Sequence, residues 1–70
     1  MKQQVDSPKH YNFSKLEVID VVEAWNLNFN EGNVLKYLAR HKYKSNPLED
    51  LKKARWYLNR IISNLEEDQA

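Results

Sequence analysis

A stripe of polar side chains on one predicted helix could hold an anionic ligand that carries a planar group. Its members recur at helical spacing: Asn33, Lys36, Tyr37 and Arg40. At about 100° per residue they lie on one side of the helix, away from Val34 and Leu38. A guanidinium gives bidentate contact to phosphate, an ammonium gives a point charge, and an amide can read the edge of a base. The alternative is an ordinary solvated helix face, on which cations are common.

A second stripe combines charges with a tryptophan on the last predicted helix. It consists of Glu49, Lys53, Trp56 and Arg60. Trp56 stands out because helical spacing turns it away from the apolar side of that helix and places it between two cations. Such a ring could stack on a base or anchor a partner subunit. We favour the subunit interface, since a small chain must bury surface somewhere, although a site between subunits would serve both purposes.

A pair of carboxylates near the start of the first predicted helix could bind a metal ion weakly. Asp20 follows Glu17 three positions later in the chain, and oxygen ligands suit Mg²⁺. The pair E-V-I-D is similar to the first carboxylate pair of the all-α nucleotide pyrophosphohydrolases, but the second pair that those enzymes use has no counterpart here. The more ordinary role for these acids is a favourable interaction with the N-terminal end of the helix.

Two aromatic side chains, His10 and Tyr11, precede every predicted helix. The imidazole of His10 is the best candidate for a general base, since histidine titrates near neutrality. The alternative is an arm that folds back and packs Tyr11 on the helices. The chain has no cysteine, so a thiol nucleophile and a thiolate zinc site are excluded.

Length and composition limit the classes of protein to which the chain can belong. Its 70 residues and net charge of +1 indicate one small domain, 1–70, with no electrostatic footprint for duplex nucleic acid. It has neither an apolar run of roughly 20 residues nor the apolar stretch of a signal peptide, which leads us to expect a cytoplasmic protein away from membranes. A chain this short buries only about 60% of its unfolded surface, so we expect a homo-oligomer.

Capping signals and apolar spacing predict an all-α fold: a small three-helix bundle with an extended N-terminal arm. The predicted arm is 1–13 and the predicted helices are about 15–26, 30–43 and 47–66. Ser14 with Glu17 forms a capping box pattern, and Asn46, Pro47 and Glu49 mark the start of the last helix. A glycine at position 32 would let another backbone or a ligand come close.

Apolar residues on the last two predicted helices indicate which faces pack together. Those expected to face inward are Val34, Leu35 and Leu38 on one helix and Leu51, Ala54, Leu58, Ile61 and Leu65 on the other. The second set follows a 3,4 spacing that suits antiparallel helix packing.

Taken together, four segments resemble a known family. They are H-Y at 10–11, E-V-I-D at 17–20, F-N-E-G-N-V-L-K-Y-L-A-R at 29–40 and N-P-L-E-D-L-K-K-A-R-W-Y-L at 46–58. The chain resembles the SaV-like family of small phage and prophage proteins over residues 6–62. The resemblance implies a set of recurrent polar positions: His10, Tyr11, Glu17, Asp20, Asn33, Lys36, Tyr37, Arg40, Glu49, Asp50, Lys53 and Trp56. Some relatives are regarded as nucleotide kinases that phosphorylate deoxynucleoside monophosphates without a P-loop.

The expected function is therefore that of a phage-encoded protein that binds a nucleotide or another phosphate-bearing small molecule. Its expected binding residues are Tyr11, Asn33, Lys36, Tyr37, Arg40, Lys53 and Trp56. In a kinase, the catalytic residues would be His10, Lys36 and Arg40, with Mg²⁺ as the cofactor. Two alternatives stay open: an oligomer that sequesters nucleotides or nucleotide signals without chemistry, and an inhibitor of a host protein with Trp56 and Tyr57 as anchors.

Overall fold

The computed structural model describes residues 15–69, and its regular structure is entirely helical. The elements are α1 (Val18–Ala24), α2 (Phe29–Arg40), the short 3₁₀ helix η3 (His41–Tyr43) and α3 (Pro47–Gln69). No strand occurs within residues 15–69, which confirms the all-α prediction. The predicted arm, 1–13, lies outside the described residues.

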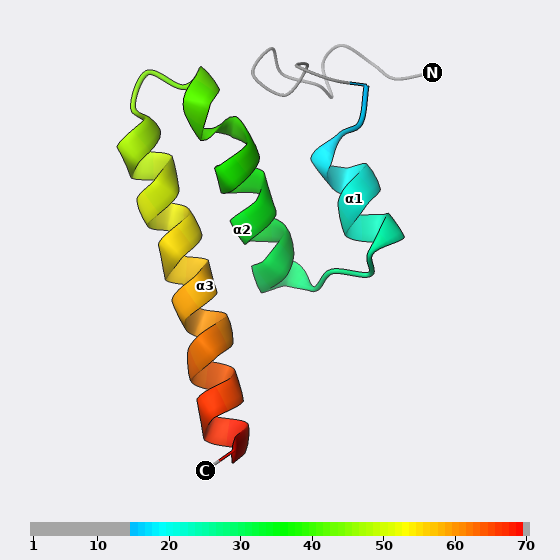
Figure 1. Cartoon of the computed structure of the whole chain (residues 1–70), viewed down its shortest axis with the longest axis vertical. Coiled ribbons are helices and arrows are strands. Elements are labelled where there is room, and N and C mark those ends of the chain that lie inside the picture. The colour runs from blue at the N-terminus through cyan, green and yellow to red at the C-terminus, as the bar shows by residue number, and fades with distance from the viewer. Residues whose placement is uncertain (1–14, 70) are drawn as a thin grey trace.

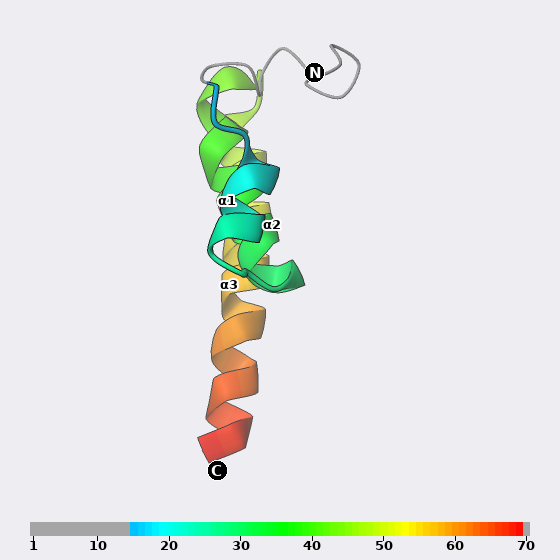
Figure 2. The same cartoon turned by 90° about the vertical axis from the view of Figure 1, so that its right-hand side faces the viewer.

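The three α-helices lie side by side in a single layer. α2 occupies the middle, with α1 along one side and α3 running antiparallel along the other (Figure 1). A view from the edge shows one helix behind the next (Figure 2), in agreement with principal extents of 45 × 28 × 15 Å. No described helix has the length and apolar character needed to cross a membrane.

A single layer of helices cannot enclose an apolar core, because each helix has at most two neighbours. Among the described residues, Ala54 is the only buried apolar side chain, and the largest fully buried side chain is Asp50. Many large apolar side chains are consequently exposed on the faces of the layer.

Helix α1 begins later than the sequence pattern predicts. The predicted start at residue 15 relied on Ser14 as the cap, and Ser14 lies outside the described residues. In the structure Glu17 is the N-cap, and its backbone N–H donates to Asp20 Oδ2 at 2.9 Å. The capping box thus lies three residues later than predicted. In it, the Asp20 carboxylate accepts the hydrogen bond that stabilises the first turn.

The turn after α1 depends on one residue in the left-handed region. Asn26 has φ 55°, and asparagine tolerates this conformation better than most residues. The N–H groups of Asn26 and Leu27 donate to the carbonyls of Glu23 and Val22 at 3.3 and 2.9 Å, the pattern of a Schellman motif. This motif ends α1 and turns the chain toward α2.

Helices α2 and α3 both begin at an asparagine cap. The Asn28 side chain accepts from the Glu31 N–H, and the Glu31 carboxylate accepts from the Asn28 N–H, each at 2.9 Å. At α3, Asn46 Oδ1 accepts from the Glu49 N–H at 3.3 Å, and Pro47 is the first helical residue. The second predicted helix was expected to reach residue 43, but the chain tightens into η3 after Arg40.

The face of α2 that packs on α3 is the polar stripe, contrary to the prediction that the apolar side faces inward. Arg40 pairs with Asp50, and the Tyr37 ring stacks on the Tyr57 ring. Leu38, expected inside, is 51% exposed. The prediction for Leu38 was wrong because an ion pair and two tyrosine rings, rather than leucines, form the contact.

The packed face of α3 is likewise rotated from the predicted one. The buried and half-buried positions follow a 4,3,4 spacing: Asp50, Ala54, Tyr57 and Ile61. The predicted residues Leu51, Leu58 and Leu65 are exposed and lie next to this face rather than on it. Apolar spacing alone could not distinguish the two faces because Ala54 and Ile61 belong to both patterns.

A close approach at Gly32 joins α1 to α2. A Cβ atom added there would lie 3.3 Å from a methyl group of Val22. The expected neighbour of this glycine was another backbone or a ligand, whereas the structure places a side chain there.

The buried ion pair should be essential to the α2–α3 contact. Asp50 is 2% exposed, and its Oδ2 accepts from Arg40 Nε at 3.0 Å. The change Asp50→Ala should lower the free energy of unfolding by about 3 kcal/mol, since it removes the buried carboxylate that balances the charge of Arg40. Urea unfolding followed by circular dichroism measures this loss.

An apolar replacement of both partners is the control for that experiment. The double change Arg40→Met with Asp50→Leu should recover most of the lost stability, because it removes both charges from the interface. A loss below about 0.5 kcal/mol for Asp50→Ala alone would contradict the structural role of the pair.

A cation and aromatic cluster as the candidate functional site

Three cationic side chains surround one tyrosine ring between α2 and α3. The distances to the Tyr37 ring centroid are 4.6 Å for Lys36 Nζ, 4.9 Å for Arg40 Cζ and 5.5 Å for Lys53 Nζ. Each distance lies within the range of a cation–π interaction. Positively charged groups from both helices therefore lie close together around this ring.

Other aromatic rings extend this arrangement. The Tyr57 ring stacks on Tyr37 with centroids 6.0 Å apart and planes at 16°, and it contacts Trp56 edge to face at 5.0 Å. The Trp56 side chain is nevertheless 61% exposed. We call the six residues the Tyr37 cluster: Lys36, Tyr37, Arg40, Lys53, Trp56 and Tyr57.

A shallow hollow lies within the Tyr37 cluster. It has a volume of about 330 Å³ and is lined by Tyr37, Lys53, Trp56 and Tyr57. Aromatic rings and an ammonium group therefore share the surface that a ligand would contact. A planar, negatively charged molecule would match both features.

The positive charge available to a ligand comes mainly from two lysines. Arg40 is paired with the buried carboxylate of Asp50, so that pair is close to neutral as a unit. Lys36 and Lys53 add two further charges next to the Tyr37 ring. Arg40 therefore fixes the position of the cluster, and the lysines give it a net positive potential.

Asn33, a predicted binding residue, makes a hydrogen bond within its own helix. Its side chain is buried, and Nδ2 donates to the Phe29 carbonyl at 2.9 Å, within α2. The residue lies on the same side of the helix as Tyr37 and Arg40, as the spacing predicted. It does not line the hollow of the Tyr37 cluster.

A second, larger hollow lies between α1 and α2. Its volume is about 460 Å³, and most of its lining is apolar. Residues from both helices and their connection contribute: Glu17, Val18, Ile19, Val22, Leu27, Asn28, Phe29, Gly32, Asn33 and Lys36. Lys36 therefore stands between the two hollows, with its ammonium group close to the Tyr37 ring.

The carboxylates predicted to bind Mg²⁺ lie at the start of α1. The Asp20 carboxylate accepts from the Glu17 N–H, so helix capping already accounts for its position. Within residues 15–69, no group of three or more histidine, cysteine or acidic side chains is placed to hold a metal ion. The magnesium site therefore stays a prediction that rests on sequence spacing.

Of the remaining predicted site residues, His10 and Tyr11 lie outside the described residues. The structure brings Lys36, Tyr37 and Arg40 together with Lys53 and Trp56 from α3. Sequence reasoning did not include Tyr57 among the binding residues, although it joins Tyr37 to Trp56. Its position four residues after Lys53 was the available signal.

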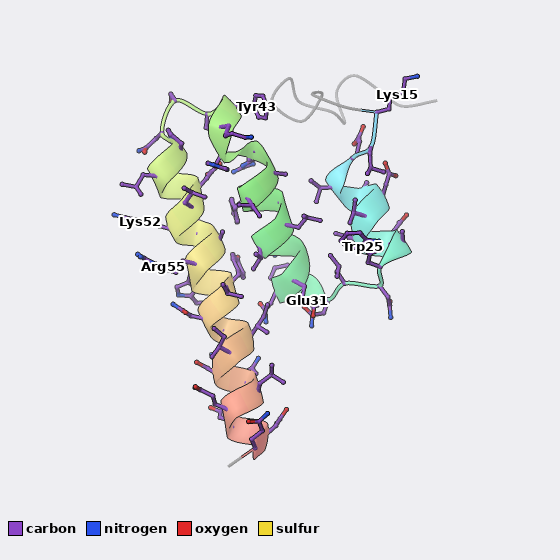
Figure 3. All side chains as sticks on the ribbon, viewed as in Figure 1. Lys15, Trp25, Glu31, Tyr43, Lys52 and Arg55 are labelled. Atoms are coloured by element: carbon purple, nitrogen blue, oxygen red, sulfur yellow. The ribbon has the colours of Figure 1, made fainter. Side chains whose placement is uncertain are left out.

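Ion quenching of tryptophan fluorescence tests the charge of the cluster without any ligand. Trp25→Phe leaves Trp56 as the only tryptophan. In that background, Lys53→Gln should lower iodide quenching relative to neutral acrylamide about twofold, the effect of roughly 0.5 kcal/mol of surface attraction. Lys52→Gln removes the same charge from another face of α3 and should leave the ratio unchanged (Figure 3). Equal effects of the two changes would contradict a local positive site.

Comparison with known proteins gives a family but no established activity. No curated protein and no solved structure matches the chain. One family model, described as a protein of unknown function (DUF3310), matches residues 5–59, a span that includes the whole Tyr37 cluster. The SaV-like resemblance and the phage origin stay predictions. Because the match covers most of the sequence, the chain belongs to the DUF3310 family.

Proposed function

We propose that the chain binds a nucleotide at the Tyr37 cluster. The observation that carries the proposal is the convergence of Lys36, Arg40 and Lys53 within 5.5 Å of the Tyr37 ring, beside a hollow lined by Trp56. A nucleotide combines the two properties that this surface matches, an anionic phosphate group and a flat aromatic base.

The phosphate group would interact with the two lysines. Lys36 lies on α2 and Lys53 on α3, so a phosphate between them would be attracted by both helices at once. Charge-assisted hydrogen bonds to phosphate are about twice as strong as neutral ones. Arg40, held by Asp50, would keep the Tyr37 ring and the two lysines in place.

The base would stack on Trp56. This side chain is the exposed end of a series of rings that continues through Tyr57 to Tyr37. Stacking of a base on an aromatic side chain contributes about 1–3 kcal/mol and tolerates every base. The cluster therefore suits nucleotides in general and does not select one base.

If the protein is also an enzyme, we propose that it transfers a phosphoryl group at the same site. Lys36 and Arg40 would then neutralise charge on the transferred group, the main contribution that a protein makes to this reaction. Its predicted general base, His10, lies outside the described residues. Binding is thus the part of the expected function that the geometry supports, and turnover is an outcome of the test.

Calorimetric titration with nucleoside mono-, di- and triphosphates and cyclic nucleotides tests the binding proposal. Lys53→Gln should lower the affinity for the nucleotide about tenfold, and Trp56→Ala should lower it at least as much. Each change removes an interaction of about 1.4 kcal/mol or more. The affinity should also fall as salt is added, because the lysine contacts are near the surface.

Two matched variants control for general effects of charge and aromatic surface. Lys52→Gln removes a lysine from another face of α3, and Trp25→Ala removes the tryptophan that directly follows α1; both should leave the affinity unchanged (Figure 3). Chromatography of the nucleotide after incubation separates transfer from simple binding. If no nucleotide binds, the proposal fails and Trp56 becomes a candidate anchor for a protein partner.

A further inference from the structure

Helix α3 carries an apolar face that no other element of the described chain covers. The face follows a 3,4 spacing from residue 48 to 65 and is interrupted only by Arg55: Leu48, Leu51, Leu58, Ile62 and Leu65. These five side chains are 37–59% exposed. A regular apolar stripe of this kind is the usual signature of a helix that pairs with another helix.

This face is distinct from the other two faces of α3. At about 100° per residue, it is centred roughly 100° from the face that packs on α2 and further still from Lys53 and Trp56. Figure 3 shows Lys52 and Arg55, at the edge and within the stripe, directed away from α2. A partner on this face would leave the Tyr37 cluster open.

The C-terminal end of α3, residues 62–69, is exposed at every position. It projects well beyond the start of α2 in both views (Figures 1 and 2). An isolated helical segment of this size is marginal in water without tertiary packing. Ile62 and Leu65 lie on this segment, so a partner there would supply the missing contacts.

The charges of α3 indicate what kind of partner fits. The helix ends in three acids, Glu66, Glu67 and Asp68, and its last turn has no basic residue. Negative charge at a helix C-terminus opposes the helix dipole, whereas the N-terminus of a second helix would stabilise it. Lys52 lies beside the apolar face near the N-terminal end of α3, and Lys42 and Lys44 precede the helix. The two acids of the first turn, Glu49 and Asp50, lie off this face. The two ends of one copy are therefore complementary.

We propose that α3 pairs antiparallel with α3 of a second copy through this apolar face. A two-fold axis near the middle of the face aligns all its residues: Leu48 opposite Leu65, Leu51 opposite Ile62, and Arg55 opposite Leu58. The acidic end of each copy then lies beside the basic end of the other. A parallel pair would instead place the three acids of each copy against their own duplicates, and so charge favours the antiparallel arrangement.

This register brings Lys52 of one copy within reach of Glu66 of the second copy, and the symmetry creates the contact twice. Arg55 can pack its aliphatic stem in the seam and extend its guanidinium to water. A single polar residue in an apolar seam also favours one register over the others. The pair of helices would carry two Tyr37 clusters, both outside the seam.

Sedimentation equilibrium of the full chain tests the association. The native protein should sediment as a dimer, and Ile62→Glu should sediment as a monomer that still shows a helical circular dichroism signal. Ile62 is already half exposed, so the change costs the single chain little packing. A monomeric native protein, or an oligomer that Ile62→Glu leaves intact, would overturn the proposal.

Charge reversal tests the register without disturbing any apolar side chain. Glu66→Lys should weaken the dimer about tenfold, since it replaces two attractions by two repulsions. Lys52→Glu in the same chain should restore the affinity. Glu67→Lys makes the same change one residue away, off the seam, and should have a clearly smaller effect. Equal effects at positions 66 and 67 would overturn this register.

Cross-linking tests the direction of the helices, since the chain has no cysteine of its own. A short bismaleimide should join Lys52→Cys in one copy to Glu66→Cys in another. It should not join two copies of Glu66→Cys, which lie about 28 Å apart along the axis of an antiparallel pair at 1.5 Å per residue. Efficient self-linking of Glu66→Cys would overturn the antiparallel arrangement.

Discussion

The ion pair between Arg40 and Asp50 sets the register on which the rest of this structure depends. It joins the last turn of α2 to the first turn of α3, at the end where η3 connects them. A buried carboxylate has few acceptable positions, since it must keep its cation within hydrogen-bond distance. Once this end is fixed, the antiparallel helices place the Tyr37 ring on the Tyr57 ring. The aromatic contacts of the cluster therefore follow from a charge contact one to two turns away.

A second constraint comes from the arrangement of the helices in one layer. Three helices side by side have two open faces, so apolar side chains cannot all be covered within a single chain. The polar interface between α2 and α3 leaves still more apolar side chains exposed, because an ion pair and two tyrosines occupy the positions between these helices. The leucines of α3 and Ile62 stay outside as a result. Association with another copy would restore the apolar burial that the fold itself does not provide.

The same side chains serve both packing and the proposed binding site. Tyr37 belongs to the helix interface through Tyr57, and it also gathers the ammonium groups of Lys36 and Lys53. Because both helices hold these groups, a ligand at the cluster would contact a site whose geometry is already set. Loops play little part in it. Such preorganisation lowers the entropic cost of binding and suits recognition of a small anion.

The helical elements and the shared side of Asn33, Lys36, Tyr37 and Arg40 could be predicted from the sequence, because caps and helical spacing are local properties. Which helix faces meet could not be predicted in this way. The sequence assigned Leu38 to the interior, yet the polar stripe packs on α3, since Asp50 lies opposite Arg40 and that pairing depends on how two helices are joined. A local sequence pattern predicts that a leucine face, rather than a polar one, packs in the interior. It contains no information on an ion pair between side chains of two different helices.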